Sequence, residues 1–310
     1  MGKAHKTSVG GQAIYEGVMM RGPKQYAVSV RLPDGSIDTV VKNNKSIKDK
    51  YPVFKLPLLR GVAGLFESLS LGYGTLMYSF EKAGIEEEEP TKFDLWLERT
   101  FGKSATKVVL GIGTVLGVVL AVGLFVLLPS LGVKLISNYV PDWSRSVLEG
   151  LIKIAVFIAY LAAVSKMPDI ARTFEYHGAE HKTIFTYEQG APLTVENVRT
   201  RSRFHPRCGT SFLLIVLVIS ILVSSLPIVT WDNVLVRALT KLALLPVVVG
   251  LSYELIQFAG RHDNVFTRFV SAPGLWLQRI TTREPDDSQI EVAIASMLPV
   301  LTGNPEDDKW

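Results

Sequence analysis

The stretch VVLGIGTVLGVVLAVGLFVLL, residues 108–128, holds 21 consecutive residues without a charged side chain. A helix of about 20 apolar residues can cross the hydrocarbon layer of a bilayer, because all its backbone hydrogen bonds are made within the segment. The whole chain of 310 residues is 48% hydrophobic, with a mean hydropathy of +0.26. These features predict an integral membrane protein rather than an ordinary soluble enzyme.

Three further stretches are long and apolar enough to be spans: residues 147–164, 211–229 and 239–259. Each of them holds at most two charged side chains. We therefore predict a mostly α-helical, polytopic membrane protein with about four transmembrane helices and a small β-rich amino-terminal cytoplasmic region.

The β-rich region is expected within residues 1–55. YAVSVRL (26–32) alternates along the chain, PDGS (33–36) is a turn signal, and IDTVV (37–41) resumes the strand pattern. The preceding GGQAIYEGVMMRGP (10–23) has glycines whose spacing indicates an irregular strand or a loop. The sequence thus predicts at least one hairpin near the amino terminus.

Residues 56–92 are expected to form an amphipathic, interfacial helix and an acidic linker. Apolar side chains recur at helical spacing from Pro57 to about Ala83. Charged residues within this pattern favour a helix that lies in the membrane interface over one that spans it. The linker is EEEEPTK, which is too acidic to be buried.

Residues 93–270 make up the expected four-span membrane domain, which includes a long loop at 166–210. This loop holds most of the basic side chains between the spans: Lys166, Arg172, Lys182, Arg199, Arg201, Arg203 and Arg207. We expect a multi-pass protein of the bacterial plasma membrane. By the positive-inside rule, its long loop and both of its termini are expected to face the cytoplasm. The tail, residues 271–310, contains DDSQIEVAIASML, which predicts a capped amphipathic helix.

The stretch FEYHGAEHKTIFTYE, residues 174–188, holds two of the five histidines in the chain. It lies within a predicted helix over 169–189, which Asp169 can cap and Gly190 can end. At 100° per residue, one stripe of this helix is apolar and inward-facing. The stripe contains Ile170, Phe174, His177, His181, Ile184 and Phe185.

Two imidazoles at i and i+4, here His177 and His181, can hold one metal ion, and Glu180 beside them can act as a general base. This H-x-x-E-H spacing is that of inverted zinc-protease motifs. The simpler interpretation is a pair of buried histidines that form hydrogen bonds in a packed helix. We favour the metal site, because inward ionisable groups of membrane proteins are functional by default.

Other ligands are available elsewhere in the sequence. His205 and Cys208 have H-x-x-C spacing, which suits zinc, and Glu254 lies inside an apolar stretch. Adding His205 and Cys208 to the two helical histidines would close a structural four-ligand site. Adding Glu254 alone would leave an open position for water, with Glu180 as the base. The simpler roles are a loop histidine, a small buried thiol and a carboxylate paired with a nearby cation.

A basic stretch precedes Cys208 and contains Arg199, Arg201, Arg203 and Arg207. Its functional interpretation is a binding site for an anionic lipid headgroup. Its simpler interpretation is topology alone, which we favour, because cytoplasmic loops carry such charge in any case. Membrane lipids are therefore the expected partners, and a membrane protein partner is a second expectation.

Five blocks of the sequence resemble those of a known family: GGQAIYEGVMMRGP, YHGAEHKTIFTYE, HPRCGTSF, SYELIQFA and APGLWLQRITTREP. Together they are similar to the YqhQ-like bacterial membrane proteins, the domain of unknown function 1385, over nearly the whole chain. The resemblance implies a metal-dependent enzyme without an established reaction, and it implies no substrate. It supports as candidates His177, Glu180, His181, His205, Cys208 and Glu254.

The leading hypothesis is a metal-dependent membrane enzyme of hydrolytic type, which acts at the cytoplasmic leaflet on an anionic or lipid-like substrate. Its cofactor would be a divalent metal ion, and zinc suits the ligands best. The alternative is a non-enzymatic membrane scaffold or accessory protein, which binds lipid or a translocation or assembly partner and uses a polar or metal cluster only for structure. No nucleic-acid module is apparent, and the net charge of +4 is modest.

Overall fold

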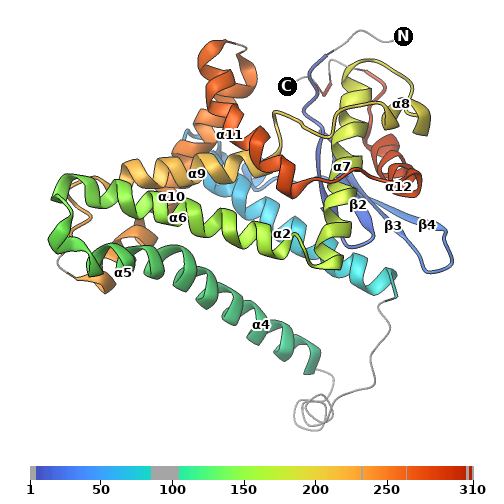
Figure 1. Ribbon diagram of the computed structural model, residues 1–310. Coiled ribbons are helices and arrows are strands. Elements are labelled where there is room, and N and C mark those ends of the chain that lie inside the picture. Colours follow the sequence, from blue (N-terminus) through green and yellow to red (C-terminus); the bar gives the residue numbers. More distant parts are fainter. Residues whose placement is uncertain (1–4, 85–104, 232, 263, 305–306, 309–310) are drawn as a thin grey trace. The chain divides into compact units, whose positions relative to one another are not determined.

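The computed structural model describes residues 5–84, 105–231, 233–262, 264–304 and 307–308, without the side chains of residues 105–110 (Figure 1). Two compact units divide the chain. Unit 1 comprises residues 1–84, 160–219 and 245–310, and unit 2 comprises residues 85–159 and 220–244. The acidic linker expected at EEEEPTK lies outside the described residues.

Unit 1 contains an antiparallel sheet whose four strands follow one another in chain order. The strands are β1 (Gly10–Ile14), β2 (Gly17–Arg21), β3 (Gln25–Arg31) and β4 (Ile37–Asn43). The predicted β3–β4 hairpin is present, and Gly35 in its turn has a φ of 84°, which a side chain would disfavour. GGQAIYEGVMMRGP forms a regular hairpin, β1–β2, where an irregular strand or loop is expected. Glu16 makes this possible by adopting a φ of 50° in the turn.

One face of the sheet is covered by α2 (Leu59–Lys82), close to the helix predicted from Pro57 to Ala83. The apolar layer between them consists of Ile14, Met19, Val28, Val30, Leu71 and Tyr78. The opposite face is covered by α7 (Pro168–Glu188) and α12 (Asp287–Met297), as Figure 1 shows. This second layer includes Val18, Met20, Ala27, Tyr176, Ala179 and Ile290. Since each large apolar side chain contributes roughly 1.5–3 kcal/mol when buried, these two layers hold the sheet and its helices together.

The ends of α7 and α12 follow local rules, with one difference from expectation. α12 begins with a capping box between Asp286 and Gln289, as DDSQIEVAIASML predicts. Gly190, with a φ of 67°, ends α7 as expected. Asp169, however, does not cap α7, because the helix begins one residue earlier at Pro168. Asp169 lies in the first turn instead, where its charge favours the helix dipole.

The remaining elements of unit 1 are short or connect the others. They are α1 (Ile47–Lys50), η1 (Pro52–Lys55), α8 (Val195–Arg199), α11 (Val265–Thr281) and η5 (Leu298–Val300). Three of the four unit boundaries fall within longer helices, which are α6 (Asp142–Val164), α9 (Gly209–Ser224) and α10 (Val234–Arg261).

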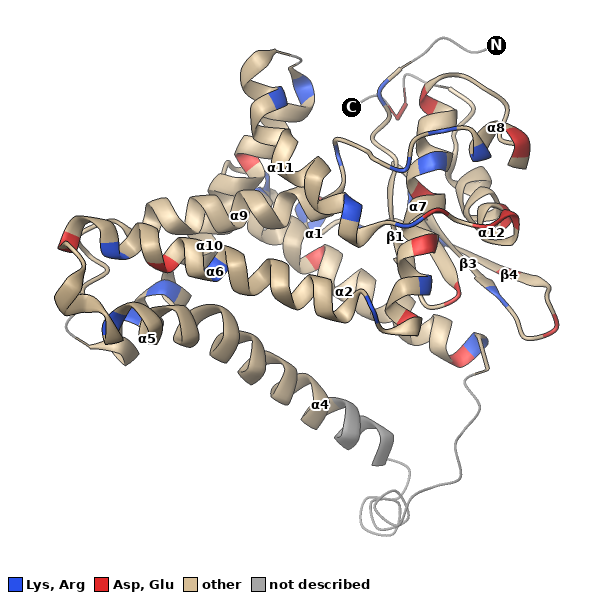
Figure 2. Cartoon of the chain, in the orientation of Figure 1, with Lys and Arg blue, Asp and Glu red and all other residues tan. Residues whose placement is uncertain are grey.

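Unit 2 begins, in its described part, with α4 (Ala105–Val122), the π-helical turn η3 (Gly123–Leu127), α5 (Leu128–Leu135) and η4 (Ser137–Tyr139). Among the described residues, three helical segments are long and apolar enough to cross a membrane: Gly111–Leu135, Asp142–Val164 and Val234–Arg261. Figure 2 shows that charged residues are absent from α9 and from the described side chains of α4.

The predicted span at residues 211–229 is shorter in the structure than expected. Its helix, α9, has 16 residues and ends at Ser224. Pro227 explains this end, because a proline has no N–H group to donate to the preceding turn and restricts the residue before it. The structure therefore has three helical segments of spanning length among its described residues, where the sequence predicts about four.

A buried polar cluster joins α5, α6 and α10 within unit 2. Glu149 accepts hydrogen bonds from Arg237, at 2.7 Å, and from Lys241 and Ser130. The side chain of Arg237 is 0% exposed and also donates to the Val229 carbonyl at 2.7 Å. Such a cluster is stable only while its charges stay paired, because a lone buried charge is costly.

Candidate metal centre

Two histidines of α7 and one cysteine converge on a single point in unit 1. His177 and His181 lie one helical turn apart, and Cys208 immediately precedes α9. Three ligand atoms, one from each side chain, lie within 4.8 Å of one another. Among the described residues, this is the group of His, Cys, Asp or Glu side chains whose spacing could hold a metal ion. His177 Nε2 and Cys208 Sγ are 3.3 Å apart. Two imidazoles and one thiol are a zinc-type donor set.

The other ring nitrogen of each histidine is held by a backbone carbonyl. His177 Nδ1 donates to the Thr281 carbonyl at 2.8 Å, and His181 Nδ1 donates to the Arg203 carbonyl at 2.5 Å. Since a carbonyl only accepts, Nδ1 carries a proton in both rings, and Nε2 is the nitrogen left to bind a metal ion. This second interaction is the usual support of a metal-ligating histidine.

The Nε2 atom of His181 is buried and has no hydrogen-bond partner in the described part of the chain. A buried acceptor without a partner costs free energy, so such an atom calls for an explanation. A metal ion bound between His181, His177 and Cys208 would explain it. The residues present therefore fit the metal that the motif implies.

The carboxylate of Glu180 lies beside this group, with its side chain 4% exposed. Its Oε2 atom is also buried without a partner among the described residues, and the Gly11 backbone N–H hydrogen-bonds the carboxylate. Burial raises the pKa of Glu180 above its usual value, although both histidines act in the opposite direction. A carboxylate whose pKa is raised returns an accepted proton more readily than an ordinary one.

The close approach of β1 to Glu180 depends on Gly11. A Cβ at this position would lie 2.5 Å from the Met19 carbonyl and 3.1 Å from the Glu180 carboxylate carbon. The glycine therefore allows the strand backbone to come within hydrogen-bonding distance of the buried carboxylate.

Electrostatics favour the thiolate form of Cys208. Burial alone would raise its pKa, but His181 and His177 outweigh burial and hold the pKa well below its usual range. Burial likewise works against protonation of His177, but the Cys208 sulfur outweighs it and raises the pKa of His177 to about 9. A thiolate is the form of cysteine that binds zinc.

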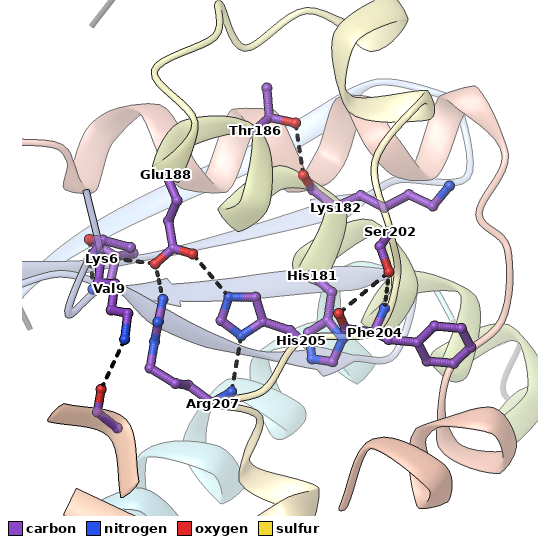
Figure 3. Close-up of polar contacts among 12 residues, drawn as sticks. Lys6, Val9, His181, Lys182, Thr186, Glu188, Ser202, Phe204, His205 and Arg207 are labelled. Atoms are coloured by element: carbon purple, nitrogen blue, oxygen red, sulfur yellow. Dashed lines mark hydrogen bonds and ion pairs between the residues drawn. The ribbon is translucent and has the colours of Figure 1, made fainter. Parts of the chain in front are cut away.

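His205, a candidate ligand in the sequence, lies outside the group. Its Nε2 is 3.3 Å from Glu188 Oε2 (Figure 3). Its backbone N–H donates to the Gln278 side chain at 2.8 Å. Arg207 also binds the Glu188 carboxylate. Burial lowers the pKa of His205 to about 4, so the ring is neutral and donates to Glu188. The structure therefore does not assemble the closed four-ligand set.

Glu254 lies on α10 and is engaged elsewhere. Its carboxylate binds Arg60, with a Nε–Oε1 distance of 2.7 Å, and accepts from the Leu58 N–H. This is the simpler role considered for it, a carboxylate paired with a nearby cation. The third ligand atom beside the two histidines comes from Cys208 instead.

Three of the four arginines in the basic stretch are also engaged within the chain. Arg199 binds Asp287, with a Nε–Oδ1 distance of 2.9 Å, and Arg207 binds Glu188. The Arg203 guanidinium donates to the Thr282 carbonyl. This contact helps to hold the loop so that the backbone carbonyl of Arg203 accepts from His181. These contacts give the stretch a structural role, and a lipid headgroup there would have to compete with them.

Sequence reasoning does not find the carbonyls of Thr281 and Arg203, because backbone acceptors leave no signature in a sequence. Gly178 does leave a signal, since a glycine inside a helix lowers its stability by about 0.5–1 kcal/mol relative to alanine and so needs a reason. The reason is close packing. A Cβ on Gly178 would lie 2.0 Å from the Arg283 carbonyl oxygen.

We expect Gly178→Ala to loosen the centre. The added methyl group would push away Arg283, which lies just after Thr281, the last residue of α11, whose carbonyl accepts from His177. Overpacking of this kind costs about 1–3 kcal/mol of stability. Loss of an outer hydrogen-bond partner lowers metal affinity by about 10–100-fold.

Thermal unfolding and a zinc-competition titration measure these two effects. Gly10→Ala is the matched control, because a Cβ there meets nothing within 4 Å. Equal zinc affinity of the two variants would contradict the role assigned to the Thr281 carbonyl.

Comparison with known proteins identifies the family of the chain. The model of a family described as "Protein of unknown function (DUF1385)" matches residues 56–302, which include α7 and Cys208. The "Uncharacterized protein YqhQ" of Bacillus subtilis (strain 168) is 37% identical over 294 residues. This alignment covers 94% of the chain and 92% of that protein. No solved structure matches the chain significantly.

Proposed function

The chain belongs to the DUF1385 family, and we propose that it is a zinc-dependent hydrolase held in the bacterial plasma membrane by its apolar helices. One observation carries the proposal. His181 presents a buried Nε2 lone pair, without a partner in the described chain, to the point where His177 and Cys208 also converge. Three helical segments of spanning length support the membrane location.

His177, His181 and Cys208 would hold the ion. Three protein ligands leave a fourth position for water or substrate, which is the arrangement of catalytic rather than structural zinc. A zinc ion held there supplies Lewis acidity to a substrate carbonyl or phosphoryl group. The proposed substrate is an anionic or lipid-like molecule at the cytoplasmic leaflet, because α7 follows directly on the apolar helix α6.

Glu180 would be the general base. In this role its unpartnered Oε2 accepts a proton from the attacking water, and burial, which raises its pKa, favours the return of that proton to the leaving group. The Gly11 N–H holds the carboxylate in position. The carbonyls of Thr281 and Arg203 keep both histidine rings in the ligating tautomer.

A second function is favoured by one contact. The 3.3 Å distance between His177 Nε2 and Cys208 Sγ is also that of an activated cysteine nucleophile, which would serve acyl transfer without a metal. This chemistry does not explain why His181 is turned toward the sulfur with an unpartnered Nε2. We therefore prefer the zinc hydrolase.

Glu180→Gln tests the proposal. The amide keeps the size of the side chain but cannot accept the proton, so we expect zinc to stay bound and hydrolysis to fall at least about 100-fold. The full chain in detergent is assayed, zinc-loaded, on chromogenic carboxylic, phosphate and phosphodiester esters and on short-chain phospholipids.

Glu175→Gln is the control, because Glu175 lies on the same helix and its carboxylate binds the Gln289 amide. Equal turnover by the Glu180→Gln and wild-type proteins would remove Glu180 from the mechanism. Absence of turnover in zinc-loaded wild type would favour the non-enzymatic scaffold.

A further inference from the structure

A concave site lies on the opposite face of the sheet from α7. It is a cleft of ≈470 Å³ in unit 1, between the sheet and α2. Its walls include Arg21, Tyr26, Lys42, Lys45, Phe66 and Tyr78. The volume is in the range of pockets that hold small ligands. Nothing in the proposed hydrolase uses this cleft.

The cleft carries a positive charge that the described residues do not neutralise. Its single carboxylate, Glu67, is already satisfied by Arg21 at 3.2 Å, by Ser46 at 2.7 Å and by the Ile47 N–H at 2.6 Å. The remaining cations, Lys42 and Lys45, have no ion pair among the described residues. Three cations and one anion give the lining a net charge of +2, which suits an anionic ligand.

The same cleft borders an exposed apolar stripe on α2. Phe66, Leu69 and Tyr73 are 71%, 63% and 53% exposed, and their spacing of three and four residues places them on one face of the helix. Phe66 belongs both to the stripe and to the cleft wall. Exposed apolar surface beside a polar rim marks a site of interaction with lipid or protein.

We propose that the cleft binds the headgroup of an anionic phospholipid, with the phosphate between Lys42 and Lys45 and the acyl chains along Phe66, Leu69 and Tyr73. Two observations favour lipid over a soluble anion. The ligand must meet charge and apolar surface on adjoining parts of one site, and α2 is the amphipathic helix that the sequence predicts at the membrane interface. The arginines of residues 199–207, in contrast, mostly have partners within the chain.

Native mass spectrometry of the full chain, released from detergent, measures the proposed binding. Dioleoyl phosphatidylglycerol is titrated against dioleoyl phosphatidylcholine. We expect phosphatidylglycerol to be preferred, and the preference to fall about 30-fold in Lys42→Gln/Lys45→Gln, since each lysine contributes to the attraction for anionic headgroups. Phe66→Ser/Leu69→Ser is also expected to weaken lipid binding, and Lys42→Arg/Lys45→Arg to keep it.

The matched control is Lys50→Gln/Lys55→Gln, which removes the same charge from exposed lysines outside the cleft. Equal loss in this control and in the cleft variant would overturn the proposal, because general surface charge would then explain the preference. Inorganic phosphate provides the other decisive arm. Two results together would overturn the proposal of a lipid ligand and show a site for soluble anions. Inorganic phosphate would displace phosphatidylglycerol at a concentration equal to that of the lipid, and Phe66→Ser/Leu69→Ser would leave lipid binding unchanged.

Discussion

The His181→Ala protein is expected to lose the metal while it keeps its fold. Wild type should purify with about one equivalent of zinc, since three ligand atoms converge within 4.8 Å. Removing one ligand should lower zinc affinity by more than the roughly 100-fold that loss of an outer-shell partner costs. Elemental mass spectrometry of the detergent-purified full chain, followed by competition with a chromophoric chelator, measures both quantities. Hydrolytic activity should disappear with the zinc.

His262→Ala is the control for this experiment, because His262 is exposed and its Nδ1 donates to the Phe258 carbonyl of α10, the helix that it follows. The double variant His177→Ala/His181→Ala should behave like the single one. Wild type that binds no zinc, after purification without chelator and attempted reconstitution, would contradict the metal centre. The two histidines would then be core residues, and the scaffold function would become the better proposal.

The Glu149→Ala protein is expected to lose about 3–5 kcal/mol of unfolding free energy, because a buried ion pair that loses one partner leaves an uncompensated charge. Glu149 is 1% exposed, and its removal would strand Arg237 and Lys241 together. Chemical unfolding of the full chain in detergent micelles measures the change. The unfolding free energy of a Glu149→Gln protein should lie between those of wild type and Glu149→Ala, because its amide oxygen still accepts one hydrogen bond.

Asp142→Ala provides the comparison on the same helix. Asp142 also pairs with an arginine, Arg145 at 2.7 Å, but its side chain is 87% exposed. Exposed pairs of this kind contribute about 0.2–1 kcal/mol, so the variant should stay close to wild type. Similar losses in the Asp142 and Glu149 variants would mean that the unit 2 cluster is not a buried network.

Local sequence patterns predict those parts of the fold that local physics decides. The β3–β4 hairpin follows from alternation around PDGS, and α12 follows from a capping box before an apolar run. The charge-free stretch at residues 108–128 predicts a spanning segment because bilayer thickness sets its length. The difference at α9 is also local, since Pro227 lies within the expected span.

The candidate site divides in the same way. His177 and His181 are paired by the sequence itself, because residues four apart in a helix share a face. The choice of the third ligand is not local. Cys208 and His205 are three residues apart, and a turn between them, closed by a 3.3 Å bond from the Cys208 N–H to the His205 carbonyl, accompanies their different surroundings. His205 binds Glu188, whereas Cys208 lies against the histidine pair of α7.

The sequence by itself determined the family, the apolar segments, the β3–β4 hairpin and the histidine pair with its neighbouring Glu180. Only the tertiary structure decided that Cys208 lies beside the histidine pair and that Glu254 pairs with Arg60. It also decided that the backbone carbonyls of Thr281 and Arg203 accept from the two histidine rings. The physical reason is sequence separation. Periodicity, capping and span length act over a few turns of chain, whereas these contacts join segments 22 to 194 residues apart.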